Sequence, residues 1–235
     1  VIAGVPYFAR VFELMNADVT VEAEVAEGTL VEPGTITMRL RGNTQDLLVG
    51  ERTALNIIQR LSGIATLTRR YVDEISLTSA TIVDTRKTAP GMRAMAKYAV
   101  LQGGGANHRF GLDSGVMVKD NHIASCGSLT EAVKRARSSN PHLLKIEVEV
   151  TTLEELNEAL ESEADVILLD NMSTETLRTA VQVARSHART PLLEASGNLN
   201  LERVKEVAQT GVDLLSIGAL THSARAVDLS LRIAS

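Results

Sequence analysis

The chain has 235 residues, enough for one large α/β domain or for a medium-sized domain with a smaller one. Hydrophobic residues make up 44% and charged residues 23%, which excludes disordered and fibrous proteins, and no apolar run approaches the roughly 20 residues of a membrane helix. The net charge of −5 and the aromatic content of 3% argue against binding to nucleic acid. Cys126 is the single cysteine, which excludes an internal disulfide and fits a reducing cytoplasm.

The first clear patterns lie before residue 75. Apolar and polar residues alternate over residues 19–25 and again over residues 36–40, with glycine and proline between the two stretches. This alternation predicts antiparallel strands that are half exposed to solvent. Apolar residues then follow helical spacing from about residue 48 to residue 73, which predicts one long amphipathic helix.

The rest of the chain alternates short apolar runs with helices, which is typical of parallel βα units. Ser128, the Thr152/Glu155 capping box and Ser173 or Thr174 mark helix starts. The runs are too few for a complete eight-stranded barrel, so we expect an open or incomplete barrel, with a doubly wound sheet as the alternative. Residues 107–110 could form a seventh strand, and the pattern does not decide this. The predicted strands lie at residues 81–83, 116–118, 144–150, 166–169, 192–193 and 214–217.

Positive charge is concentrated in one segment. Residues 84–122 contain six Lys and Arg and three Asp, a net charge of +3, whereas the rest of the chain carries −8. The alternative interpretation is a solvated helix face with scattered cations. Cations gathered in one segment of an acidic protein favour a site for a small anion.

Polar residues close almost every predicted strand. Because the carboxyl ends of parallel strands converge on the ligand site in barrels and open sheets, we expect these residues to form one site. They are Asp84 to Lys87, Lys119 to His122, Glu149, Asp170 and Asn171, Glu194, Ser196 and Gly197, and Ser216 and Gly218.

The residue types at these strand ends indicate the chemistry. Arginine binds carboxylate or phosphate with two parallel hydrogen bonds, and Arg86 and Arg109 are candidates. Glu149 and Asp170 suit a hard cation such as Mg²⁺ or ribose hydroxyls. Ser196-Gly197 and Gly218 precede predicted helices, a common phosphate location in barrels.

Other site classes find little support. His108 and His122 have no further His or Cys at zinc-ligand spacing, and there is no Gly-x-Ser-x-Gly nucleophile elbow. Gly103 to Gly105 lack the preceding strand and following lysine of a phosphate loop, so they are interpreted as a flexible turn.

The motifs are specific enough to resemble a family. ERTALN (51–56), DTRKTAPGMR (84–93), NHR (107–109), VMVKDNHI (116–123), LLDN (168–171) and EASG (194–197) occur in this order. The chain therefore resembles the quinolinate phosphoribosyltransferases, also called nicotinate-nucleotide pyrophosphorylases (carboxylating). The resemblance runs from Ala3 to the end, and it implies a version that lacks the family's N-terminal helices.

The resemblance implies a fold and a reaction. The fold would be an open-faced α/β sandwich followed by an incomplete, open parallel α/β barrel, the type II phosphoribosyltransferase fold. Residues 1–58 with 222–235 would form the sandwich domain, residues 59–221 the barrel, and a helix from about His222 would return to the first domain. The reaction would convert quinolinate and phosphoribosyl pyrophosphate into nicotinate mononucleotide, pyrophosphate and CO₂ with Mg²⁺, in cytoplasmic NAD biosynthesis.

The resemblance also implies roles for individual residues. Lys87, Lys119, Glu149 and Asp170 would be catalytic, and Glu149 and Asp170 would hold the metal. Asn198 departs from a Ser-Gly-Gly turn found in many members, so its effect on phosphate binding stays open. Arg52 would act across the interface of a homodimer or a dimer-based hexamer. Quinolinate would contact Arg52, Thr85, Arg86, Lys87, His108, Arg109 and Lys119, and phosphate would contact Ser196, Gly197, Asn198, Ile217, Gly218 and Ala219.

Three alternatives stay open at this stage. A related phosphoribosyltransferase-like barrel of the molybdate-transport type shares the Arg-Lys-Thr-x-Pro-Gly segment, although Asn107-His-Arg109 and Lys119-Asp-Asn-His122 favour quinolinate. A Schiff-base aldolase would use Lys119, because such lysines occur at barrel strand ends. A phosphate-ligand sensor without catalysis is the third.

Overall fold

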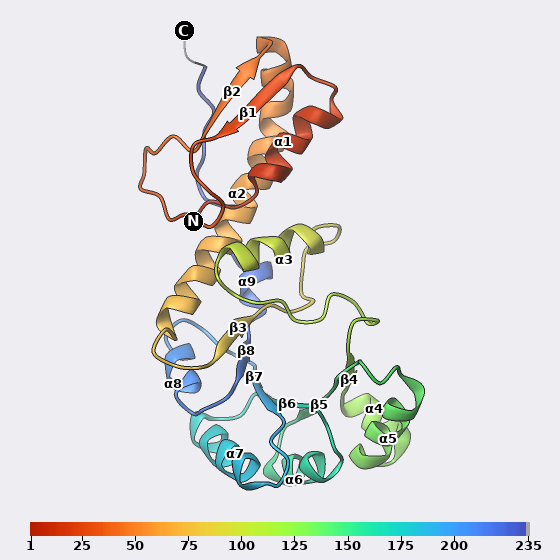
Figure 1. The fold of residues 1–235 in the computed structure, drawn as a ribbon. Coiled ribbons are helices and arrows are strands. Elements are labelled where there is room, and N and C mark those ends of the chain that lie inside the picture. The colour runs from red at the N-terminus through yellow and green to blue at the C-terminus, as the bar shows by residue number, and fades with distance from the viewer. Residues whose placement is uncertain (234–235) are drawn as a thin grey trace. The chain divides into compact units, whose positions relative to one another are not determined.

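The structure is a computed structural model that describes residues 1–233 (Figure 1). The chain divides into two compact units. Unit 1 consists of Val1–Val72, Lys87–Ala106 and the chain from Gly218 on, and unit 2 consists of Asp73–Arg86 and Asn107–Ile217. The domain boundaries expected at residues 58/59 and 221/222 stay a prediction.

Unit 1 packs helices against a two-stranded antiparallel sheet. Strands β1 (Val19–Ala23) and β2 (Met38–Gly42) pair with Val19 opposite Gly42, which confirms the two strands expected from alternation. Helix α2 (Thr44–Glu74) confirms the predicted long helix and extends it at both ends. The other helices are α1 (Val5–Leu14), α3 (Arg93–Gln102) and α9 (Ala219–His222).

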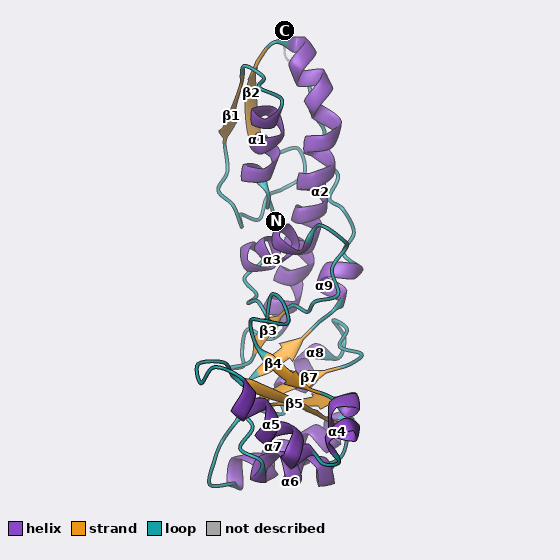
Figure 2. Ribbon diagram, turned by 90° about the vertical axis from the view of Figure 1, so that its right-hand side faces the viewer, coloured by secondary structure: helices purple, strands orange, loops and turns teal. Residues whose placement is uncertain are grey.

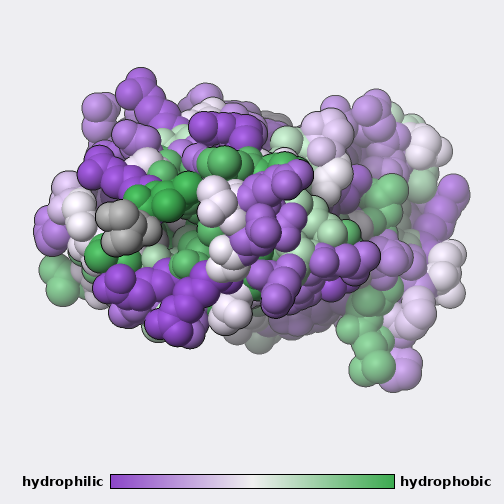
Figure 3. All heavy atoms as spheres, turned by 90° about the horizontal axis from the view of Figure 1, so that it is seen from above, coloured by the Kyte–Doolittle hydropathy of each residue, from purple (hydrophilic) through white to green (hydrophobic). Residues whose placement is uncertain are grey.

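The core of unit 1 forms where α1 meets α2. Phe8 and Phe12 of α1 are buried against Leu55 and Ile58 of α2, and the half-buried side chains of β1 and β2 cover this cluster. Gly50 permits the close approach of the helices, because a Cβ atom there would lie 2.5 Å from the Phe12 ring. Other apolar side chains stay exposed, and Figure 3 shows hydrophobic patches among hydrophilic side chains on the face seen from above.

The helix expected from about His222 is wrong. Helix α9 ends at His222, and residues 224–233 continue without helix or strand. Val227 donates its N–H to the Gln59 carbonyl at 3.0 Å, and the Gln59 amide donates to the Leu229 carbonyl at 2.7 Å. Val227, Leu229 and Leu231 recur every second residue, and Leu229 and Leu231 pack on the core of unit 1. This spacing fits an extended chain better than a helix.

Unit 2 is built on a parallel sheet. Within residues 1–233 its six strands follow the order β3-β8-β7-β6-β5-β4, so β3 and β4 are its two edges and the barrel is open, as expected. All neighbouring strands in this sheet are parallel, and residues 107–110 form no strand. The strands are β3 (Thr81–Val83), β4 (Val116–Val118), β5 (Ile146–Val150), β6 (Val166–Asp170), β7 (Leu192–Ser196) and β8 (Leu214–Ser216).

Helices cover one side of this sheet. Figures 1 and 2 show α5, α6 and α7 on the same side of the strands. The predicted caps are confirmed: Ser128, Thr152 and Ser173 each accept the first-turn N–H that begins a helix. None of the described helices is long and apolar enough to cross a membrane. The helices of unit 2 are α4 (Asp120–Cys126), α5 (Leu129–Ser139), α6 (Leu153–Glu161), α7 (Thr174–Ser186) and α8 (Val204–Ala208).

Candidate active site

The strand register of unit 2 places its polar side chains on one face of the sheet. Side chains alternate between the two faces of a strand, and residues paired across parallel strands share a face. Glu149 is paired with Leu168, and Leu168 with Glu194, so these residues and those two positions away lie on one face. The opposite face carries Val148, Ile167 and Leu193, which are fully buried.

These polar side chains form two layers. The outer layer, at the carboxyl edge, contains Glu149, Asp170 and Ser196, with Lys119 directly after β4. The inner layer contains Glu147, two residues before Glu149 on β5, and Glu194, two residues before Ser196 on β7. Strand pairing puts Glu194 level with Glu149, so the two layers are distinguished by burial and by contact with His108. Glu147 and Glu194 are buried, whereas the outer residues are partly exposed.

Lys119 and Glu149 form an ion pair in the outer layer. Lys119 is also the N-cap residue of α4, and its backbone N–H donates to Nδ1 of His122 at 3.0 Å. The position of Lys119 is therefore set at its backbone by His122 and at its side chain by Glu149. An ammonium held beside a carboxylate is a fixed cation at the edge of the sheet, and this differs from the neutral amine that Schiff-base formation needs.

A turn after β7 adjoins the end of β6. The Asn171 amide nitrogen donates to Asp170 at 2.7 Å, and the Asn198 amide nitrogen donates to Asn171 at 3.1 Å. Gly197 has a φ of 92° and Asn198 a φ of 51°, both in the left-handed region. Asparagine tolerates this region better than most residues, so Asn198 keeps a turn conformation that glycine also adopts.

The inner layer surrounds the ring of His108. Nε2 of His108 lies 3.1 Å from Glu147 and 3.6 Å from Glu194, and Nδ1 accepts the backbone N–H of Arg109 at 2.7 Å. The backbone N–H of His108 donates to the fully buried Asp84 at 2.9 Å. Both ring nitrogens thus already have partners within the protein.

Electrostatics in the inner layer are strongly coupled. Burial, reinforced by the charge of Glu147, raises the pKa of Glu194 to about 7. Burial lowers the pKa of His108, but its hydrogen bond to Glu147 and the two carboxylate charges outweigh that effect and raise it. Burial and the charge of Arg86 lower the pKa of Arg109.

The predicted cations of unit 2 lie near this layer. The guanidinium of Arg109 donates to the Gly115 carbonyl at 3.0 Å and contacts the Met117 sulfur at 3.6 Å. Arg86 acts electrostatically on Arg109, so the two guanidinium groups are neighbours. Thr85 and Arg86 lie two and three residues after the end of β3 and are partly exposed. Unit 2 therefore brings together Asp84, His108, Arg109 and the inner carboxylates.

The remaining predicted residues belong mostly to unit 1. The Thr221 hydroxyl donates to the Lys87 carbonyl at 2.7 Å, and a Cβ atom on Gly218 would lie 3.2 Å from the Lys87 side chain. Lys87 and Gly218 are therefore neighbours, and Ala219 begins α9. Arg52 is exposed on α2, and Ile217 is buried at the end of unit 2, where its N–H donates to the Val83 carbonyl at 3.0 Å.

Family models match both parts of the chain. The model described as quinolinate phosphoribosyl transferase, C-terminal domain, matches residues 64–232, and the corresponding N-terminal domain model matches residues 1–62. The chain belongs to the quinolinate phosphoribosyl transferase family.

Individual relatives agree with this family. The chain is 46% identical over 233 residues to a probable nicotinate-nucleotide pyrophosphorylase [carboxylating] of Synechocystis, covering 99% of this chain and 79% of the relative. It is 45% identical to nicotinate-nucleotide pyrophosphorylase [carboxylating] of Mycobacterium leprae, covering 98% and 82%. The crystal structure of NadC from Streptococcus pyogenes matches with a TM-score of 0.93 and 40% identity, covering 99% of this chain and 81% of that chain.

Sequence reasoning about this member of the quinolinate phosphoribosyl transferase family missed Glu147 as a site residue. Its signal was a charged residue inside the apolar run Ile146–Val150, two positions before Glu149 and so on the same face. Sequence reasoning also treated Glu194 as a strand end, whereas β7 continues to Ser196 and Glu194 lies inside the strand.

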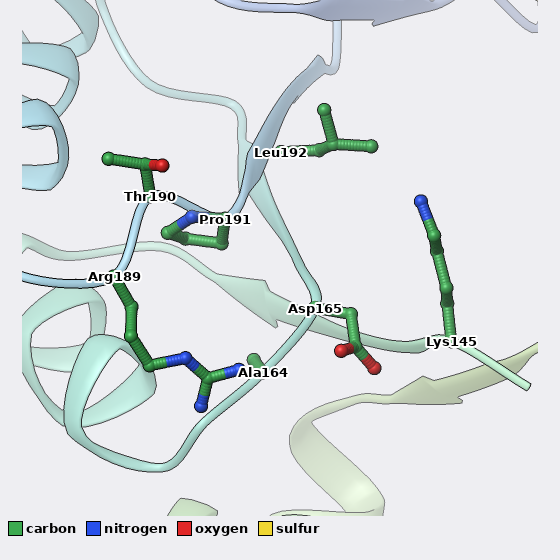
Figure 4. Close-up of a pocket in the computed structure, with 7 residues that line it drawn as sticks. All are labelled: Lys145, Ala164, Asp165, Arg189, Thr190, Pro191 and Leu192. Carbon is green, nitrogen blue, oxygen red and sulfur yellow. The ribbon is translucent and has the colours of Figure 1, made fainter. Parts of the chain in front are cut away.

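A pocket of about 290 Å³ lies at the opposite edge of the sheet (Figure 4). It is lined by residues that precede or begin β5, β6 and β7, including Lys145, Asp165 and Leu192. Figure 4 shows the Lys145 and Arg189 side chains pointing in different directions rather than converging. Asp165 already accepts from Arg137 at 2.7 Å and from the Ile146 N–H at 2.8 Å, so its carboxylate ties β6 to β5 and α5.

Proposed function

We propose that this family member transfers the phosphoribosyl group of phosphoribosyl pyrophosphate to quinolinate, with decarboxylation, in NAD biosynthesis. The products are nicotinate mononucleotide, pyrophosphate and CO₂. The observation that carries this proposal is the outer layer of unit 2, where Lys119, Glu149 and Asp170 lie at the carboxyl edge of an open parallel barrel. Family membership supports the choice of quinolinate over the molybdate-type, aldolase and sensor alternatives.

Quinolinate is a dianion, and the proposed binding residues supply the matching cations. Arg86 and Arg109 are neighbours and can each bind a carboxylate with two parallel hydrogen bonds. Fixed cations bring two anionic substrates together in one orientation, which lowers the entropic part of the barrier. The complete proposed set is Arg52, Thr85, Arg86, Lys87, His108, Arg109 and Lys119.

The phosphoribosyl group is assigned to the turns that follow the last strands. The left-handed turn of Gly197 and Asn198 begins directly after Ser196, at the carboxyl edge of β7. Barrels commonly bind phosphate after their last two strands. We assign the 5-phosphate to Ser196, Gly197, Asn198, Ile217, Gly218 and Ala219, and we assign Lys87 and Lys119 to the pyrophosphate or phosphoribosyl group.

The outer-layer carboxylates fit Mg²⁺ by their chemistry. Glu149 and Asp170 offer oxygen ligands from neighbouring strands, and both are partly exposed at the carboxyl edge of the sheet. When bound, Mg²⁺ would neutralise the departing pyrophosphate. We also assign the ribose hydroxyls to Glu149 and Asp170, whose carboxylates can accept hydrogen bonds from them as C1 gains positive charge.

The chain's own residues then act by charge and orientation. Lys119 places a cation beside the anionic substrates, and its pairing with Glu149 keeps that cation aligned before substrate arrives. The guanidinium groups of Arg86 and Arg109 hold the ring carboxylates while the ring nitrogen attacks C1. After attack, the positive charge on the ring nitrogen stabilises the electron pair that loss of CO₂ leaves on the neighbouring ring carbon, and a proton from solvent then forms the C–H bond at that carbon.

Arg52 is proposed to complete the site of a second copy in a homodimer or dimer-based hexamer. Leu48 and Val49 lie four and three residues before Arg52, on the same face of α2, and they are 55% and 64% exposed. Exposed apolar side chains next to a charged one favour burial against a partner. This supports a second copy as the partner of that face.

One assay tests the proposed reaction. Purified protein is given phosphoribosyl pyrophosphate and Mg²⁺ with quinolinate or with nicotinate, and nicotinate mononucleotide and pyrophosphate are measured. We expect product from quinolinate and much less from nicotinate, which lacks the second carboxylate for the arginine pair. Equal use of both substrates would contradict the assigned role of that pair, and borohydride-trapped adducts at Lys119 would favour the aldolase.

A further inference from the structure

The mechanism above leaves the two inner-layer carboxylates without a role. The side chains of Glu147 and Glu194 are 8% and 1% exposed, and His108 between them is 15% exposed. Oε1 of Glu147 and Oε1 of Glu194 receive no hydrogen bond from any described residue. Buried carboxylates carry a high desolvation cost, so the burial of these two needs compensating contacts.

The hydrogen bonds define the tautomer of His108. Nδ1 accepts the backbone N–H of Arg109, and this bond requires an unprotonated Nδ1. The ring hydrogen is therefore on Nε2, which lies 3.1 Å from the Glu147 carboxylate and donates to it. Protonating Nδ1 would place a second hydrogen against the Arg109 N–H, so the described geometry is that of the neutral ring.

His108 thereby connects Glu147 to Arg109. The segment of His108 and Arg109 lies outside the sheet, so strand pairing does not hold it. The bonds that hold it include the His108 N–H to Asp84, the Arg109 N–H to the His108 ring, and the Arg109 guanidinium to the Gly115 carbonyl. The position of the ring in turn depends on its bond to Glu147.

We propose that Glu147 is a positioning residue, which acts on the substrate dianion through the His108 ring and the Arg109 guanidinium. The proposal rests on the proposed function, because it takes Arg109 to bind a quinolinate carboxylate. Glu194 lies 3.6 Å from Nε2, beyond hydrogen-bond distance, and contributes a second buried carboxyl beside the ring. A bound cation is a poorer explanation of the cluster, because the charge of Arg109 already acts on both His108 and Glu147.

Kinetic constants for both substrates test this role. Glu147→Ala removes the acceptor, and we expect kcat/KM for quinolinate to fall about tenfold or more while KM for phosphoribosyl pyrophosphate is retained. Glu147→Gln keeps an oxygen that accepts from Nε2, and we expect it to restore most of the loss. Glu155→Ala is the matched control: Glu155 is a partner in the capping box of α6, so its loss weakens unit 2 without moving His108.

The ring nitrogens give a readout that is independent of catalysis. In protein labelled with ¹⁵N at histidine, and at a pH above the raised pKa of His108, we expect His108 of the wild type to show a protonated Nε2 and a bare Nδ1. Glu147→Ala should shift these resonances toward a mixture of tautomers, and Glu155→Ala should leave them unchanged. Should Glu147→Ala fail to fold, the wild-type and Glu147→Gln spectra still test the hydrogen bond from Nε2 of His108 to the side chain at position 147.

The outcomes separate the two proposals. A wild-type His108 with its hydrogen on Nδ1 would overturn the positioning role while quinolinate turnover continued. Equal losses of kcat/KM for both substrates in Glu147→Ala would also overturn it. So would a Glu147→Gln variant whose kcat/KM for quinolinate is as low as that of Glu147→Ala. A wild type that forms no product from quinolinate would overturn the proposed function, and the role of Glu147 toward quinolinate with it.

Discussion

The ammonium of Lys119 and the carboxylate of Glu149 form an ion pair across neighbouring strands, β4 and β5. Lys119 is the first residue after β4, and its backbone is held by His122 of α4. The position of the ammonium group is therefore determined both by the end of β4 and by the start of α4. Its exposed fraction of 42% leaves it accessible to a substrate at the carboxyl edge.

Lys119→Ala is expected to lower kcat by about a hundredfold or more and to leave the fold intact, because the contact of this cation is made mainly in the transition state. Turnover and circular dichroism measure the two effects. Lys134→Ala, an exposed lysine on α5, is the control that removes the same charge elsewhere. A near-normal kcat in Lys119→Ala would show that Lys119 is a solvated strand end.

Glu149→Ala and Asp170→Ala are expected to weaken the binding of phosphoribosyl pyrophosphate and Mg²⁺ more than the binding of quinolinate. Both carboxylates lie in the outer layer, where they offer oxygen ligands to a metal and to ribose hydroxyls. KM values for the two substrates and the Mg²⁺ dependence of the rate check this expectation. If KM rose equally for both substrates, the two carboxylates would support the structure of the site rather than bind phosphoribosyl pyrophosphate and Mg²⁺.

Gly197→Ala is expected to raise KM for phosphoribosyl pyrophosphate and to lower Tm. A Cβ atom on Gly197 would lie 2.2 Å from Oδ1 of Asn171, and the φ of 92° adds strain of about 1–3 kcal/mol. Asn198→Gly is the comparison, because glycine adopts the φ of 51° and loses only the 3.1 Å bond to Asn171. Similar effects of the two changes would contradict the steric argument.

Glu194 should make stability depend on pH. Its pKa is raised from 4.5 to about 7, so between these pH values the folded state keeps a proton that the unfolded state has released. The free energy of unfolding then falls as the pH rises from about 4.5 to about 7. Urea unfolding across this range should show a smaller fall in Glu194→Gln than in wild type; identical slopes would place the titration elsewhere.

Mixing Arg52→Ala with Lys119→Ala tests whether Arg52 acts across a dimer interface. Each variant alone should be inactive, whereas a mixed dimer would collect both lesions in one site and leave the other intact. With full exchange and independent sites, activity should approach about a quarter of wild type. If subunits exchange and no activity returns, Arg52 serves its own chain or lies outside the site.

The sequence by itself determined the elements whose signals are local. The apolar runs at residues 81–83 and 116–118 became β3 and β4, and Ser128 and Thr152 capped the expected helices through contacts within three residues. Polar residues after apolar runs also indicated the outer layer, since strand direction alone brings the carboxyl ends of parallel strands to one edge.

Only the tertiary structure decided the rest. Residues 224–233 were expected to be helical, but bonds to Gln59 hold them extended. Glu147, His108 and Glu194 lie on separate segments, and the register of β5, β6 and β7 with the fold of residues 107–109 brings them together. Side-chain alternation determines which residues of a strand share a face, but strand register and the placement of the loop determine which of them meet. These depend on packing between distant segments, which no local pattern in the sequence contains.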